Sequence, residues 1–115
     1  MQTQGDVEMD KREATAIAKQ YAHVVAQDMN PDKIVLYGST ARGTRRDDSD
    51  IDVAVIFDRF EGNALKTASR LCRLSGEISF DDVNVEIEPL LCIASDDRSG
   101  FVEEILRTGE VLFER

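Results

Sequence analysis

The chain has 115 residues, of which 42% are hydrophobic and 32% are charged. This length and composition are typical of one globular domain, and no apolar run approaches the roughly 20 residues needed to cross a bilayer. The net charge of −9 argues against generic binding to nucleic acid and to anionic membranes. We expect a flexible tail over residues 1–9 and a single domain over residues 10–115.

The N-terminal stretch MQTQGDVEMDKREA is polar and acidic. It lacks the basic start and apolar middle of a secretory signal. Cys72 and Cys92 lie in apolar stretches and fit no metal-ligand spacing, which is typical of buried, reduced thiols. The sequence therefore predicts a cytoplasmic protein.

Apolar residues recur at helical spacing from Asp10 to Asp28 and predict a first helix. Asp10 is a candidate N-cap, with Glu13 in the capping-box position. The helix is followed by the chain breaker Asn30-Pro31-Asp32.

Two apolar, β-branched segments then predict strands over Lys33–Tyr37 and Ile51–Phe57. Between them, the segment from Ser39 to Arg46 is compatible with a helical turn or a short helix.

The segment from Glu61 to Phe80 predicts a helix, with Gly76 as a weak point near its end. A third strand is predicted from Val83 to Ile93. Pro89 interrupts it, which favours an edge position or a bulge there.

The last helix is predicted to be capped by Asp96 or Asp97 and to stop at Gly109, and residues 111–113 can add a strand. The element order predicts an α+β fold: a small mixed β-sheet of three to five strands with helices packed on one face. The other face would stay open for chemistry.

The polar loop between the first two strands begins with Gly38-Ser39 and ends in Asp50-Ile51-Asp52. Because strand side chains alternate, both carboxylates would leave the strand on one side, roughly 7 Å apart, and could hold hard cations such as Mg²⁺. Gly38 permits a tight turn, and Ser39 offers a hydroxyl and an N–H for phosphate. These parts suit phosphoryl or nucleotidyl transfer.

The stretch GSTARGTRRDDSDIDVAV resembles the signature of the DNA polymerase β-like nucleotidyltransferase superfamily, and within it the minimal nucleotidyltransferase, or MNT, domains. This resemblance implies that Gly38 and Ser39 hold nucleotide phosphates. It also implies that Asp50 and Asp52 ligate Mg²⁺, with two ions and ATP or another NTP as the substrate.

The same resemblance implies a third carboxylate, from the segment VNVEIEPLL, that binds metal and deprotonates the attacking hydroxyl. Glu86 lies between two hydrophobic residues, as the third acid of the superfamily usually does, and is preferred. Glu88, just before Pro89, is the alternative.

Basic residues gather in the same loop. Arg42, just past Ser39, is the candidate for the phosphates, whereas Arg45 and Arg46 are expected to pair with the neighbouring Asp47-Asp48 on the surface. Tyr37 is expected in the core, although a tyrosine beside the site could itself be modified, and His23 is expected to be a packing or surface residue.

The sequence thus supports a Mg²⁺-dependent nucleotidyltransferase that moves NMP, AMP from ATP by preference, onto a hydroxyl of a protein acceptor. MNT proteins that resemble this one commonly pair with a helical HEPN protein as the antitoxin of a toxin–antitoxin system, and some AMPylate a tyrosine of the toxin. A homodimer is also compatible with the sequence. The alternative is a catalytically weak nucleotide- or partner-binding module that neutralises a HEPN toxin by covering it.

Overall fold

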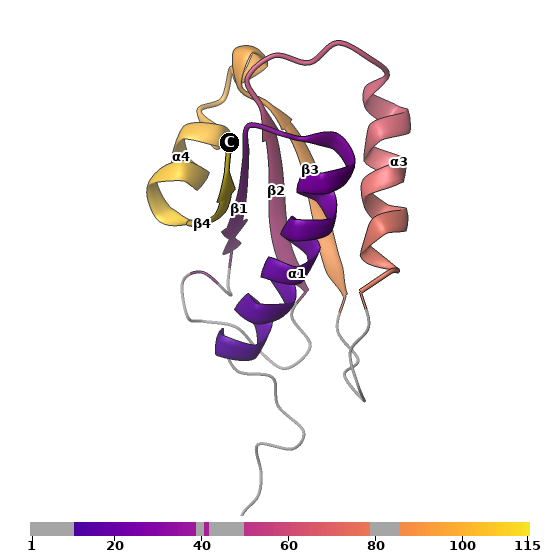
Figure 1. Cartoon of the computed structure of the whole chain (residues 1–115). Coiled ribbons are helices and arrows are strands. Elements are labelled where there is room, and N and C mark those ends of the chain that lie inside the picture. The colour runs from indigo at the N-terminus through magenta and orange to yellow at the C-terminus, as the bar shows by residue number, and fades with distance from the viewer. Residues whose placement is uncertain (1–10, 39–40, 42–49, 79–85) are drawn as a thin grey trace, which may run out of the picture.

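The computed structural model describes residues 11–38, 41, 50–78 and 86–115. Its named elements (Figure 1) are α1 (Lys11–Met29), β1 (Lys33–Tyr37), β2 (Ile51–Phe57), α3 (Ala64–Ser75), β3 (Ile87–Ile93), the 3-10 turn η2 (Ala94–Asp96), α4 (Phe101–Thr108) and β4 (Glu110–Glu114). The four strands form one sheet in the order β3-β2-β1-β4. β1 is antiparallel to β2 and to β4, whereas β2 and β3 are parallel. The predicted α+β fold with a small mixed sheet is confirmed.

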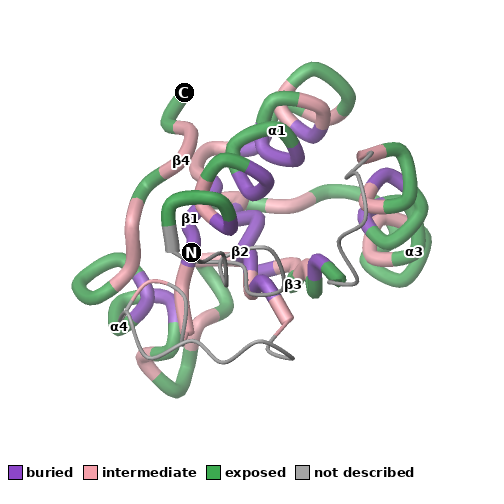
Figure 2. The backbone as a smooth tube through the Cα atoms, turned by 90° about the horizontal axis from the view of Figure 1, so that it is seen from below, coloured by how far each residue is buried: buried purple, intermediate pink, exposed green. Residues whose placement is uncertain are grey.

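The sheet is covered on both faces. On one face, fully buried side chains of β1 and β2 such as Ile34 and Val53 pack with the apolar stripes of α1 and α3. On the other face, Val35 and Ile56 pack with Val102 and Ile105 of α4. Figure 2 shows α1 and α3 on one side of the strands and α4 on the other.

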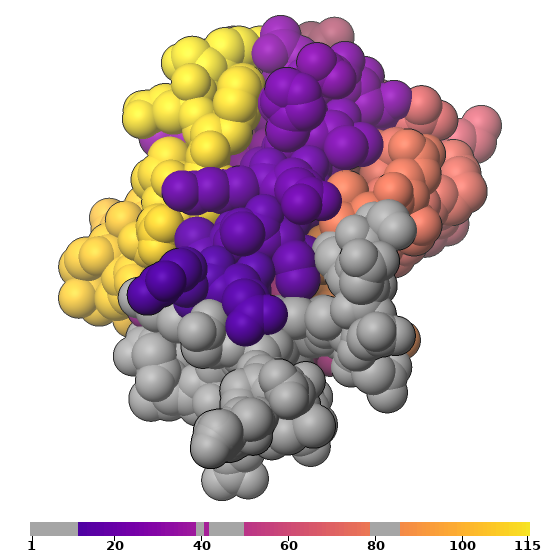
Figure 3. Space-filling model, turned by 60° about the horizontal axis from the view of Figure 1, so that its bottom comes forward, coloured from indigo at the N-terminus to yellow at the C-terminus, as the bar shows by residue number. Residues whose placement is uncertain are grey.

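The prediction that the helices share one face is therefore right for α1 and α3 and wrong for α4. The reason lies in the composition of β1 and β2, which are apolar at successive positions. Because side chains alternate along a strand, such runs place apolar groups on both faces, and both faces then need cover. In the space-filling view, α1 lies across the sheet face that it covers, with β4 on one side of it and α3 on the other (Figure 3).

The strand boundaries predicted for β1 and β2 agree with the structure, and β4 extends the predicted C-terminal strand by one residue at each end. α1 agrees within one residue at each end, while its candidate cap Asp10 lies outside the described residues. The prediction for residues 39–46 also falls largely outside them.

The helix predicted from Glu61 is shorter than expected. Asn63 caps α3 by accepting a hydrogen bond from the backbone N–H of Lys66 at 3.0 Å, and the helix ends before Gly76, the predicted weak point. Because the Asn63 side chain satisfies a free amide of the first turn, it fixes where the helix begins. Phe80 lies outside the described residues.

β3 is an edge strand, as Pro89 predicted. The carbonyl of Glu86 accepts a hydrogen bond from the N–H of Ile51 at 2.9 Å, so the backbone of Glu86 faces β2. Backbone direction alternates in a parallel pair, which turns the position of Pro89 outward, where its missing N–H breaks no bond within the sheet. Residues 83–85 of the predicted strand lie outside the described residues.

The loop after β3 anchors α4. The carboxylate of Asp97 accepts hydrogen bonds from the N–H groups of Phe101, at 3.1 Å, and Val102, at 3.0 Å. Of the two predicted capping residues, Asp97 therefore stabilises the first turn, although Gly100 occupies the N-cap position itself. Gly109 ends the helix as predicted.

Both cysteines are free thiols, but only Cys92 is buried. The prediction that Cys72 is also buried is wrong. α3 buries Leu71 and Leu74, and the residue after Leu71 lies about 100° further around the helix, on the exposed side. Among the helices in the described part of the chain, none is long and apolar enough to cross a membrane.

Candidate active site

Two aspartates mark the start of β2. Asp52 lies within the strand between Ile51 and Val53, which are fully buried against α1 and α3. Side-chain alternation therefore turns Asp52 to the opposite face, where it is partly exposed. Asp50 directly precedes β2 and is also partly exposed. Their carboxylates lie at the end of the sheet where the loop from β1 returns.

Glu88 brings a third carboxylate to this place. It is the register partner of Asp52 across the β2–β3 pair, and its carboxyl group forms a hydrogen bond with the carboxyl group of Asp50. The pKa of Glu88 is raised, first by this hydrogen bond with Asp50 and then by the negative charges of Asp50 and Asp52. Three acids thus share one small region.

Glu86, the preferred third carboxylate of the sequence prediction, is placed differently. It is exposed and precedes the first residue of β3. It lies near enough to add a further, smaller increase to the pKa of Glu88. Of the two candidates, the structure brings Glu88 against Asp50, so the geometry favours the alternative.

Gly38 lets the backbone approach these acids. It follows β1 with φ of +76°, a left-handed conformation that favours glycine. A Cβ at this position would lie 2.3 Å from Oδ2 of Asp52, well inside van der Waals contact. The absence of a side chain therefore allows the turn after β1 to pass directly beside the Asp52 carboxylate.

Tyr37 packs against the core on the α4 face of the sheet, as expected, and also borders the same acids. It is the register partner of Asp52 on β1 and is partly buried. Burial first, and then the charges of Asp52, Cys92 and Glu88, raise its pKa to about 12. The phenol therefore stays protonated at neutral pH and can donate a hydrogen bond. Its ring packs edge-on against Phe101 of α4, with 5.9 Å between the ring centroids.

The contact of Phe101 with Tyr37 was not predicted from the sequence, where Phe101 belongs only to the apolar stripe of the last helix. Phe101 is 41% exposed. Its position follows from α4 packing on the face of the sheet that carries the carboxylates, which no local pattern specifies. For Tyr37, by contrast, the sequence already raised a position beside the site, and antiparallel pairing of β1 with β2 sets it beside Asp52.

Five of the predicted loop residues, together with Asp48, lie outside the described residues: Ser39, Arg42, Arg45, Arg46 and Asp47. His23 is exposed on α1, in agreement with the expectation of a packing or surface residue.

The donor chemistry of Asp50, Asp52 and Glu88 fits a hard cation such as Mg²⁺, which prefers carboxylate oxygens. The raised pKa of Glu88 shows that negative charge is concentrated there, and a bound cation would relieve this repulsion. Within the described ranges, however, no group of three or more His, Cys, Asp or Glu side chains is arranged to hold a metal ion.

Comparison with known proteins identifies the family. Residues 19–115 match the family model described as "Polymerase beta, Nucleotidyltransferase". The chain belongs to this nucleotidyltransferase family. Members of the family generally use an NTP and a divalent metal, in keeping with the acidic cluster at the start of β2.

The fold agrees with this assignment. The chain is similar to the crystal structure of a protein from Sulfolobus solfataricus described as a nucleotidyltransferase, with a TM-score of 0.64 and 19% identity over 91% of this chain and 84% of that chain. A search of curated proteins finds no significant match.

Proposed function

We propose that this nucleotidyltransferase domain moves a nucleoside monophosphate, AMP from ATP, onto a hydroxyl of a protein acceptor in a Mg²⁺-dependent reaction. One observation carries the proposal: Asp50, Asp52 and Glu88 gather on one face of the sheet, beside a glycine turn that a side chain would obstruct. Neighbouring carboxylates repel one another and destabilise the fold unless a positive group offsets their charge. Their grouping therefore favours a functional role.

Asp50 and Asp52, with Glu88, would hold the metal. When bound, Mg²⁺ supplies positive charge that offsets the triphosphate and the three carboxylates. The backbone at Gly38 and Ser39, with Arg42, would hold the phosphates that leave.

Glu88 is suited to act on the acceptor hydroxyl. Its carboxylate takes the hydroxyl proton, and the acceptor oxygen forms a bond to the α-phosphorus of the nucleotide. The bond from that phosphorus to the bridging oxygen breaks, and its electron pair leaves with pyrophosphate. Its position beside Asp50 and Asp52, in the same acidic group, favours Glu88 for the role of base.

The acceptor follows from the MNT resemblance of the loop motif. We propose a cytoplasmic antitoxin whose partner is a helical, HEPN-type toxin, and the hydroxyl belongs to a side chain of that partner. The net charge of −9 favours a basic protein partner over nucleic acid.

The proposal is tested in two measurements. Calorimetry should detect ATP binding that is strengthened by Mg²⁺ and lost in the double variant Asp50→Asn with Asp52→Asn, whereas Asp96→Asn, an exposed acid elsewhere, should bind ATP as the wild type does. Incubation with ATP, Mg²⁺ and a helical, HEPN-type partner protein should add the mass of AMP to that partner. ATP binding that is indifferent to both Mg²⁺ and the double variant would contradict the proposal.

The second candidate function is a binding module that neutralises the partner by covering it. One observation favours it: the described residues contain no ready group of three metal ligands. On this alternative, the Asp50→Asn and Asp52→Asn variant would still inhibit the toxin as strongly as the wild type does, without ATP. Loss of inhibition in that variant would exclude the binding module.

A further inference from the structure

Among the described residues, the outer edge of β3 has backbone groups that no strand of the sheet pairs with. The carbonyl of Glu86 accepts a hydrogen bond from the N–H of Ile51 on β2. Because backbone direction alternates along a strand, the N–H and C=O groups of Leu91 and Ile93, at odd positions after Glu86, point away from the sheet. In the part of the chain that the structure describes, no strand pairs with this side of β3. Such an edge can accept an added strand from another protein.

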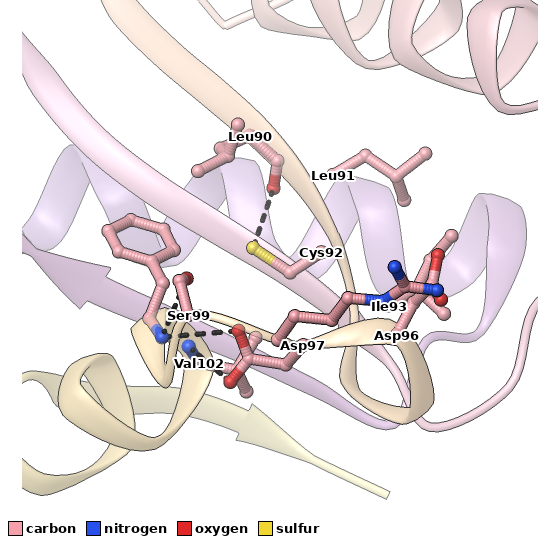
Figure 4. Close-up of a pocket in the computed structure, with 10 residues that line it drawn as sticks. Leu90, Leu91, Cys92, Ile93, Asp96, Asp97, Ser99 and Val102 are labelled. Carbon is pink, nitrogen blue, oxygen red and sulfur yellow. Dashed lines mark hydrogen bonds between the residues drawn. The ribbon is translucent and has the colours of Figure 1, made fainter.

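A pocket of about 540 Å³ lies at the same edge, between β3 and the N-terminal end of α4. Leu91 and Ile93 line it, together with the side chains of Leu90 and Phe101. Leu90 is 38% exposed and Phe101 is 41% exposed. Figure 4 shows the carboxylate of Asp97 turned toward the start of α4, where it caps the helix. The pocket therefore offers apolar and aromatic surface beside a strand edge, and Asp96, Arg98 and Ser99 add polar groups to its lining.

The pocket and the acids share one strand. Glu88, which is hydrogen-bonded to Asp50, lies two residues before Leu90 on β3, and residues two apart face the same side of a strand. The Tyr37 ring, which contacts Phe101, lies beside Asp52 and Glu88. An extended chain along β3 would therefore pass from the pocket to the carboxylates.

The direction from which the acceptor hydroxyl approaches the nucleotide is inferred from the proposed function and rests on it. Gly38, where the leaving phosphates are proposed to lie, follows β1 on one side of β2. In-line displacement requires the attacking oxygen to arrive from the side opposite the leaving group. That side is β3, on which Glu88 stands.

We propose that the protein acceptor binds as an extended segment along the open edge of β3, with an apolar or aromatic side chain in the pocket beside Phe101 and its hydroxyl directed to Glu88. Backbone groups of Leu91 and Ile93 pair with the segment. Basic residues in the segment are favoured, because the chain carries a net charge of −9.

The probe is a labelled synthetic peptide, acetyl-Lys-Val-Lys-Val-Tyr-Val-Lys-Val-Lys-amide, whose binding to the full chain is measured by fluorescence anisotropy without nucleotide. Phe101→Ala and, separately, Leu90→Lys should each weaken peptide binding about tenfold or more. Leu65→Ala, which removes a more exposed apolar side chain on α3 (77% exposed), should leave peptide affinity unchanged. A peptide with proline in place of alternate valines should bind much more weakly, because it cannot donate backbone hydrogen bonds to the edge.

ATP binding with Mg²⁺ is measured on the same variants by calorimetry and should not change. A loss of ATP affinity in Phe101→Ala would mean that the pocket holds the nucleoside and would overturn the proposal. The proposal would also be overturned if both peptides bound equally well or if neither bound. A wild-type dimer that the Phe101→Ala substitution dissociates would overturn it as well. If the peptide binds as expected but ATP does not bind at all, the proposed function fails while the docking edge stands.

Discussion

Acidic residues at the two ends of the sheet have opposite surroundings. At the end where β1 begins and β2 finishes, Asp32 accepts a hydrogen bond from the N–H of Asp58 at 2.7 Å and pairs with Arg115. The N–H of Asp58 is the main reason that the pKa of Asp32 is lowered. At the other end, Glu88 is hydrogen-bonded to a second acid, Asp50, and its pKa is raised.

Asp28 extends the comparison. It forms a two-pronged hydrogen bond with Arg70, including 2.6 Å from Nε to Oδ2, which lowers its pKa. Acids paired with bases and amides stabilise the fold in their charged form, whereas acids paired with one another weaken it. The difference separates an end whose acids stabilise the fold from the end that we propose to hold a positive ligand.

The largest effect is expected at Glu88. Glu88→Gln should lower the rate of AMP transfer about 10²- to 10⁴-fold, the usual contribution of a general base, while Glu86→Gln should change it little. Mass spectrometry of the acceptor at fixed times measures both rates. Equal losses in the two variants would show that the contact with Asp50 does not identify the third carboxylate.

A second test separates backbone strain from crowding of the acids. Gly38 and Gly100 have nearly the same φ, +76° and +80°, but a Cβ at Gly100 meets nothing within 4 Å. Both alanine variants should therefore lose stability by a similar amount through strain, about 1 kcal/mol. Only Gly38→Ala should in addition displace Asp52 and lower transfer about 10²-fold.

Thermal unfolding and transfer rates of the two variants provide the measurement. If Gly100→Ala lost as much activity as Gly38→Ala, contact with Asp52 would not be the cause.

The smallest effect is expected at the opposite end. Because the pKa of Asp32 lies below its ordinary 3.8, the folded state holds fewer protons than the unfolded state in this range. Its contribution to stability is present above that ordinary value and is lost as the pH falls through the lowered pKa. Asp32→Asn should therefore be slightly less stable than the wild type at neutral pH, and the difference should shrink below about pH 4.

Urea unfolding at neutral and acidic pH measures this difference, and transfer activity at neutral pH should be unaffected. A stability difference that does not vary with pH would show that the charge of Asp32 is not what stabilises this end.

The local pattern determined much of this protein. β1 and β2 begin and end where predicted, because apolar β-branched runs are bounded by Pro31-Asp32, by Gly38 and by Asp50. Alternation along β2 was enough to put Asp52 on the face opposite Val53. The motif around these residues indicated the nucleotidyltransferase family, which the match over residues 19–115 shows.

Only the tertiary structure distinguished Glu88 from Glu86 and placed α4 on the second face of the sheet. Glu86 and Glu88 are two residues apart, so alternation gives both the same side. Only the folded structure shows that Glu88 is the register partner of Asp52 and that its carboxyl group interacts with Asp50. Register and helix placement depend on contacts between segments distant in sequence, which compete for the same apolar surface. For that reason the acidic residues could be predicted from the sequence, whereas the strand edge and the pocket beside them could be identified only from the tertiary structure.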